Sequence, residues 1–197
     1  MTEYIPYILS LFVGVGLAAA TGFRIFLPIF FISLGTFMGW IPVNDAYAWI
    51  GGLPAVIATG IATLIEILAY YIPYVDNALD SISVPLATVA GSLLVASQFT
   101  ELNAWTQWAL AIIAGGGTAA TISSALAGTR AASTGTTAGI ANPLISTVET
   151  IFSTIMSIFA VFLPVLAIII VLFLLYLAFK FGKRLMQKLR PGKKAIS

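Results

Sequence analysis

The sequence predicts an all-α protein, a polytopic bundle of transmembrane helices with about five to six crossings. Of its 197 residues, 60% are hydrophobic and 8% are charged, whereas a soluble domain carries about 25% charged residues. Apolar stretches recur between Ile5 and Phe179, and several reach the roughly 20 residues that cross a bilayer as a helix. Helices are the expected spanning form because a backbone in lipid must satisfy its own hydrogen bonds.

The first apolar run is too long for a single straight helix. Residues 5–38 form it, and at 1.5 Å per residue they would extend roughly 50 Å, against a hydrocarbon core of about 30 Å. Gly22 precedes Arg24, and Pro28, which removes a helix hydrogen bond, follows. We therefore expect a break near Gly22 and Pro28, either as one kinked helix or as two half-helices.

The middle of the chain predicts three further helices, separated by Pro73 and by a short turn that carries Glu101. They are expected at residues 51–72, at 82–98 and from Ala104 onward. Pro85 would lie in the first turn of the second of these helices, where its missing N–H costs little.

Residues 114–141 are almost all small. Gly, Ala, Ser or Thr occupies every position except Ile122, Leu126, Arg130 and Ile140. Small residues allow helices to approach closely in membranes, so we expect this segment at the centre of the bundle. Its later part, 133–139, is so rich in Gly and Thr that a helix is not expected there.

The last apolar run, 144–179, predicts a second break near Pro164 and a final crossing before a basic end. Seven of the nine basic residues lie from Lys180 onward. Such a cluster after a membrane helix indicates the cytoplasmic side. We predict one transmembrane domain at 1–182 and a basic cytoplasmic tail at 183–197, with the N-terminus outside if there are five crossings.

The composition excludes several chemistries. There is no cysteine and no histidine, which removes disulfides, thiolate catalysis, the usual zinc ligand and a Ser-His-Asp triad. The basic tail has no accompanying motif for reading nucleic acid, so we expect no nucleic-acid partner. Since the first segment has no positive residues before it, we expect it to be a retained membrane helix, not a signal peptide.

Arg24 and Arg130 are the leading site candidates. They are the two basic residues outside the C-terminal cluster, and a guanidinium inside a membrane is costly unless it is paired or faces water. Glu66 and Glu149 are candidate partners, and the rival interpretation is a structural Glu66–arginine salt bridge. Asn142 joins the candidates because it lies on the same helix face as Glu149, at a helix start that offers N–H groups to an anion.

Asp76 and Asp80 form a weaker candidate site. They are four residues apart, so on a helix they share a face and repel unless a cation bridges them. Their oxygens suit Mg²⁺, Ca²⁺ or Na⁺. The alternative is two solvated acids in an interfacial loop.

Several motifs resemble one bacterial integral-membrane family. They are Gly16-Leu-Ala-Ala-Ala-Thr-Gly-Phe-Arg24-Ile-Phe-Leu-Pro28, the segment from Glu66 to Asp80, Gly115-Gly-Gly, and Asn142-Pro143 together with Arg130. The family is the domain of unknown function numbered forty-one twenty-six. The resemblance implies a small multi-pass bacterial membrane protein and implies no activity. We expect its location to be the bacterial inner membrane.

Three functions compete on these residues. The leading hypothesis is a small transporter or channel-like permease for an anionic solute or lipid headgroup, with H⁺ or Na⁺ coupling, because two guanidiniums match such anions. The second is a Mg²⁺-dependent membrane enzyme acting on a phosphorylated lipid. The third is a non-catalytic assembly protein whose charges form internal salt bridges. An enzyme is the less favoured class, and a homodimer is expected.

Overall fold

The computed structural model describes residues 4–72, 75–99 and 102–189, and this part of the chain is helical, without strands. Five helical stretches are long and apolar enough to cross a membrane, or six if a bent pair is one span. They are Ile5–Phe23, Val75–Gln98, Ala104–Thr137, Asn142–Phe162 and Pro164–Arg184. The predicted all-α transmembrane bundle of five to six crossings is confirmed.

Helix α1 (Ile5–Phe23) occupies the centre of the bundle. It packs against four other helices, which are α4 (Val75–Gln98), α6 (Gly117–Thr137), α7 (Asn142–Phe162) and α8 (Pro164–Leu189). Small residues permit this packing, since a Cβ on Gly16 would lie 2.8 Å from the Ala160 Cβ, closer than real Cβ contacts. The last nine residues before Phe23 are consequently buried, and they carry the chain to Arg24 in the interior.

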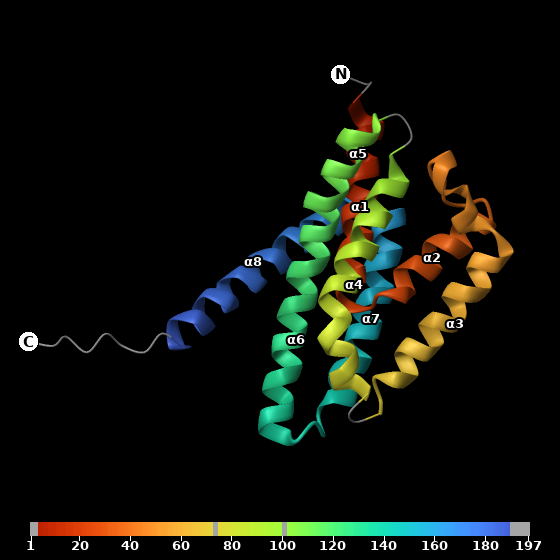
Figure 1. The fold of residues 1–197 in the computed structure, drawn as a ribbon. Coiled ribbons are helices and arrows are strands. Elements are labelled where there is room, and N and C mark those ends of the chain that lie inside the picture. The colour runs from red at the N-terminus through yellow and green to blue at the C-terminus, as the bar shows by residue number, and fades with distance from the viewer. Residues whose placement is uncertain (1–3, 73–74, 100–101, 190–197) are drawn as a thin grey trace, which may run out of the picture.

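The break after α1 separates a helix long enough to span the membrane from a short helix. Arg24 has an extended backbone (φ −140°, ψ 127°), and α2 (Phe26–Phe37) starts in a new direction (Figure 1). Pro28 lies in the first turn of α2, where a missing N–H is harmless. With 12 residues, α2 is about 18 Å long and too short to span the core. The predicted break near Gly22 and Pro28 is confirmed.

An outer arm follows the break. Helix α2 packs against the short helix η2 (Asp45–Gly51) and against α3 (Leu53–Ala69). Figure 1 shows α2 and α3 side by side on one flank of the bundle, with the end of α3 returning toward α4. This return brings Glu66 and Tyr70 back to the bundle interior.

Helix α4 begins earlier than predicted. It starts at Val75 instead of 82, and it carries Asp76, Asp80 and Pro85 within it. The Asp76 carboxylate accepts a hydrogen bond from the Asn77 N–H at 2.7 Å, which stabilises the first turn. The interpretation of the two acids as loop residues is therefore wrong. Pro73 and Glu101 lie outside the described residues.

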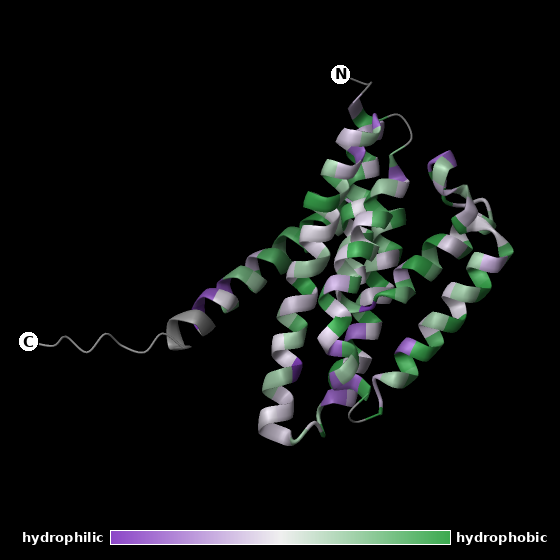
Figure 2. Ribbon diagram, in the orientation of Figure 1, coloured by the Kyte–Doolittle hydropathy of each residue, from purple (hydrophilic) through white to green (hydrophobic). Residues whose placement is uncertain are grey.

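The small-residue segment lies at the edge of the bundle. Helix α5 (Ala104–Leu110), the π-helical turn η3 (Ala111–Gly116) and α6 run on as one rod. One face packs on α1 and α4, while the opposite face of small side chains is exposed, and Figure 2 shows α6 pale along its length. The expected central position is wrong, and so is the expected loss of helix after 133, because α6 continues to Thr137.

The second predicted break is confirmed. Helix α7 ends at Phe162 and α8 begins at Pro164. Figure 1 shows α8 running out to one side of the bundle, away from the end at which α1 begins. Lys183 and Arg184, the first residues of the predicted tail, are exposed and still helical. Residues 190–197 lie outside the described part.

Candidate functional site

Arg24 is fully buried at the end of α1 and is held by α7. Its Nη2 donates to the carbonyl of Ser146 at 2.7 Å and also to the Ser146 hydroxyl. Its Nε donates to the Thr150 hydroxyl at 3.0 Å. Ser146 and Thr150 are one turn apart on α7, so a single helix face positions the guanidinium.

Arg130 is 2% exposed and lies against Glu149. Its Nε donates to Glu149 Oε1 at 3.1 Å and its Nη2 donates to Oε2, a two-pronged arrangement that fits a carboxylate. Asp80 Oδ1 lies 3.7 Å from the same Nε. Glu149 Oε2 also lies 3.7 Å from Arg24 Nη2, so the two arginines share one carboxylate. The prediction that Glu149 partners the arginines is confirmed.

Tyr70 joins the two guanidiniums. Its ring centroid is 4.2 Å from Cζ of Arg24 and 4.1 Å from Cζ of Arg130, within range of cation–π attraction. The ring is 6% exposed. Sequence reasoning missed this residue, although Tyr70 follows Glu66 by four positions and so shares its helix face.

Glu66 binds backbone instead of an arginine. Its Oε1 accepts the Ile25 N–H at 2.8 Å, and its Oε2 accepts the Phe26 N–H at 2.9 Å. These N–H groups open α2, where the helix dipole favours a negative charge. The Glu66–arginine salt bridge of the rival interpretation is not among the ion pairs of the described residues. Glu66 instead fixes the helix break that places Arg24.

Asn142 and Asp76 form a separate contact nearer the end of the bundle. The Asn142 amide nitrogen donates to Asp76 Oδ2 at 2.7 Å and to the Thr134 hydroxyl at 3.1 Å. This contact ties together the start of α7, the start of α4 and the last turns of α6. Asn142 lies on one face of α7 with Glu149, as expected, but its side-chain hydrogen bonds within the described residues go to Asp76 and Thr134 and not to either arginine.

The two aspartates have different partners in the structure. Asp76 is engaged by Asn142 and Asp80 approaches Arg130. Within the described residues, no group of three acidic side chains is placed to hold a metal ion. Side chains of the protein therefore already contact both carboxylates, Asn142 that of Asp76 and Arg130 that of Asp80.

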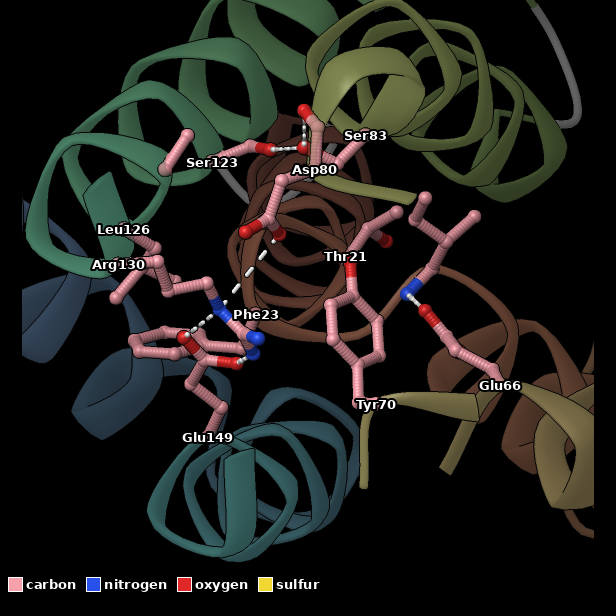
Figure 3. Close-up of a pocket in the computed structure, with 13 residues that line it drawn as sticks. Thr21, Phe23, Glu66, Tyr70, Asp80, Ser83, Ser123, Leu126, Arg130 and Glu149 are labelled. Atoms are coloured by element: carbon pink, nitrogen blue, oxygen red, sulfur yellow. Dashed lines mark hydrogen bonds and ion pairs between the residues drawn. The ribbon is translucent and has the colours of Figure 1, made fainter. Parts of the chain in front are cut away.

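A small polar cavity lies among these side chains. Figure 3 shows Asp80, Arg130 and Glu149 turned toward one another from three helices, with Tyr70 beside them and Glu66 directed at the start of α2. The space that water centres can occupy is about 10 Å³, enough for a single water. Asp80 and Glu149 are five and seven residues from the starts of their helices, which places the cavity about 10 Å inside this end of the bundle.

Each arginine of the pair has one unpaired donor, and of the two only Arg130 lines the cavity. Nη1 of Arg24 and Nη1 of Arg130 are buried and have no hydrogen-bond partner among the described residues. A buried donor left without a partner costs about 1–3 kcal/mol, and more when it is charged. The arginine pair therefore keeps hydrogen-bonding capacity for a further acceptor.

Comparison with known proteins identifies a family that the chain matches, and the description of that family names no activity. A family model described as "Domain of unknown function (DUF4126)" matches residues 11–184. No curated protein and no solved structure matches the chain.

Proposed function

The chain belongs to the family Domain of unknown function (DUF4126), and from its buried arginine pair we propose that it is a small membrane transporter for an anionic solute or lipid headgroup. The observation that carries the proposal is that Arg24 and Arg130 share Glu149 while Nη1 of each has no hydrogen-bond partner in the part of the chain that the structure describes. Planar guanidiniums match the oxygens of phosphate and carboxylate groups. An anion that reaches the pair would find two free donors there.

The charge balance supports coupling to H⁺ or Na⁺. Glu149 and Asp80 balance the two guanidiniums. Glu66, on α3, instead accepts an N–H group at the start of α2, and Asp76 lies in the first turn of α4. Helix dipoles favour negative charge at both places. A bound monoanion adds one uncompensated charge, which a proton on Glu149 or Asp80, or a Na⁺ ion, would balance.

In the proposed transport step, the anion replaces the Glu149 carboxylate as the counter-ion of the guanidiniums. The anion competes with the Glu149 carboxylate for the guanidiniums, and a proton taken up by Glu149 weakens the hold of that carboxylate. The cavity has room for about one water, so the bundle has to open for the anion to enter. The helix breaks at Arg24 and Leu163 are the positions where backbone geometry changes between rigid segments.

A flux assay on charge-pair variants tests the proposal. Purified protein in liposomes is given inorganic phosphate, glycerol 3-phosphate or a fluorescent phosphatidylglycerol, and internal pH is followed with a dye. Arg130→Gln and Glu149→Gln are each expected to destabilise the protein by about 3–5 kcal/mol, because a buried charge loses its partner. The double variant removes both charges, so its stability is expected to recover in part.

Flux separates a transport site from a structural salt bridge. We expect all three variants to lose at least about tenfold of wild-type flux, as loss of one charge-assisted contact predicts. If the double variant is folded and its flux equals that of the wild type, Arg130 and Glu149 have only a packing role. Absence of flux of all three probes with the wild-type protein would also overturn the proposal.

The geometry favours a transporter over a Mg²⁺-dependent lipid enzyme. That enzyme needs Asp76 and Asp80 to hold one metal ion, whereas Asn142 and Arg130 engage them separately. Dependence of lipid turnover on Mg²⁺ would reverse this preference. The double variant described above tests the assembly-protein alternative.

We further propose a bacterial inner-membrane location with the C-terminus in the cytoplasm and a homodimeric state. Lys180, Lys183 and Arg184 near the end of α8 support this orientation. Since the chain has no cysteine, the Ser197→Cys variant can be labelled at that one position in intact cells. Labelling by a membrane-impermeant reagent from outside would contradict the orientation, and a one-copy mass in nanodiscs would contradict the dimer.

A further inference from the structure

A large groove separates α6 from the outer half of α8. It encloses about 1070 Å³. One wall is the exposed small-residue face of α6, and the other is formed by large apolar side chains of α8. Its representative lining residues are Ala125, Gly128, Ala132, Leu174, Leu177 and Phe181. The lined part of α6, residues 120–132, is about 18 Å long, which suits an extended chain.

The groove and the polar cavity share a wall. Phe23 and Leu126 line both spaces. The Phe23 ring stacks on Phe152 of α7, with centroids 5.8 Å apart and planes 16° from parallel, and it directly precedes Arg24. Two apolar side chains therefore stand between the groove and the arginine pair.

The groove has a basic end. Arg184 is part of its lining, and the described lining contains no acid. The neighbouring Lys183 is exposed as well but does not line the groove. Basic side chains at the end of a membrane helix attract anionic headgroups, so the groove combines walls suited to acyl chains with a rim suited to a phosphate.

We propose that this groove binds a phospholipid with an anionic phosphate headgroup and is the membrane-side entrance to the arginine site. The acyl chain lies along α6, the phosphate approaches Arg184, and displacement of Phe23 and Leu126 opens the way to Arg24 and Arg130. This inference rests on the proposed function and narrows its substrate to an anionic lipid. A second copy of the chain is the competing occupant.

Photolabelling of the full chain tests the proposal. The protein is placed in phosphatidylcholine nanodiscs that contain either a photoreactive phosphatidylglycerol or a photoreactive phosphatidylcholine, and labelled peptides are located by mass spectrometry. We expect phosphatidylglycerol to label the α6 and α8 peptides in preference to phosphatidylcholine. We also expect free inorganic phosphate not to compete, because it lacks the acyl chain.

Two pairs of matched variants sharpen the test. A side chain added at Gly128 meets no atom within 4 Å, and the same holds at Gly117 on the same helix but outside the groove lining. Gly128→Leu should reduce phosphatidylglycerol labelling about tenfold by filling the groove, with Gly117→Leu unchanged. Arg184→Gln should reduce it several-fold as a charged contact is lost, with Lys183→Gln close to wild type.

The outcomes separate this inference from the proposed function. Equal labelling by both lipids, or a wild-type dimer that Gly128→Leu splits into monomers, overturns the lipid groove. Flux of a soluble anion that needs Arg130 but is unaffected in Gly128→Leu also overturns it, while the transporter proposal stands. Specific labelling of the groove, together with flux that does not depend on Arg24 or Arg130, upholds the groove and refutes the arginine site.

Discussion

Removal of the Glu66 carboxylate should release the start of α2. The carboxylate accepts the N–H groups of Ile25 and Phe26 at 2.8 and 2.9 Å and is 7% exposed. A hydrogen bond to a charged group contributes about 1.5–3 kcal/mol net. Glu66→Ala loses both bonds, so the local opening free energy should fall by at least about 3 kcal/mol. Glu66→Gln keeps one acceptor oxygen and should show roughly half of this loss.

Amide hydrogen exchange on the full chain in nanodiscs measures this release directly. A loss of about 3 kcal/mol corresponds to exchange more than about 100-fold faster in a peptide that contains residues 25 and 26. Thr63→Ala is the matched control, because Thr63 is also buried on α3, 7% exposed, and bonds to Thr59 of its own helix. Exchange in Glu66→Ala within about threefold of this control would refute the assignment of Glu66 as the cap of α2.

Three further predictions concern stability, measured as thermal unfolding midpoints in detergent. Tyr70→Phe should stay within about 1 kcal/mol of wild type because the ring remains under both guanidiniums, whereas Tyr70→Ala should lose about 3–5 kcal/mol; similar losses would contradict the stacking role. Gly16→Val should cost about 1–3 kcal/mol by forcing α1 from α7, while Gly117→Ala, with open space around it, should gain about 0.4–1 kcal/mol. Asn142→Leu should cost about 1–3 kcal/mol because Asp76 Oδ2 loses its donor, and an unchanged midpoint would refute that contact.

Charge and proline placement allowed much of the fold and part of the site to be predicted. Arg24 and Arg130 stood out because a membrane segment tolerates a guanidinium only with a partner or water. The breaks near Pro28 and Pro164 followed from run lengths that exceed the bilayer. The structure bears out both breaks and brings both arginines to Glu149.

The partner of Glu66 could not be predicted because it is backbone. An acid inside a membrane helix suggests an arginine when only side chains are considered. A helix break frees N–H groups that carry no signature in residue type. Once α2 is known to start at Phe26, two donors become available, and Glu66 on the adjacent helix accepts from them.

The predicted helix ends were wrong where the helix propensity of single residues was given too much weight. Gly and Thr after residue 133 disfavour a helix in water, yet α6 continues to Thr137, since a backbone in lipid has no other partner for its polar groups. Helix α4 also continues through Pro85, ten residues after its start, although proline has no N–H for a helix hydrogen bond. The helix ends where Ala138 and Gly139 take left-handed conformations (φ 53° and 84°), a common C-terminal signal.

The shared carboxylate makes this cluster larger than a single ion pair. One guanidinium and one carboxylate in a fork arrangement, as in Arg130 with Glu149, satisfy each other. Adding Arg24 at 3.7 Å from the same Glu149 oxygen places a second positive charge in the site and leaves buried Nη1 donors on both arginines without a partner in the described residues. For packing alone, an apolar side chain at position 24 would avoid both costs, and such replacements of buried ion pairs are often stabilising. The presence of Arg24 is therefore one reason for proposing an acceptor at the pair, which in the proposed function is the anion.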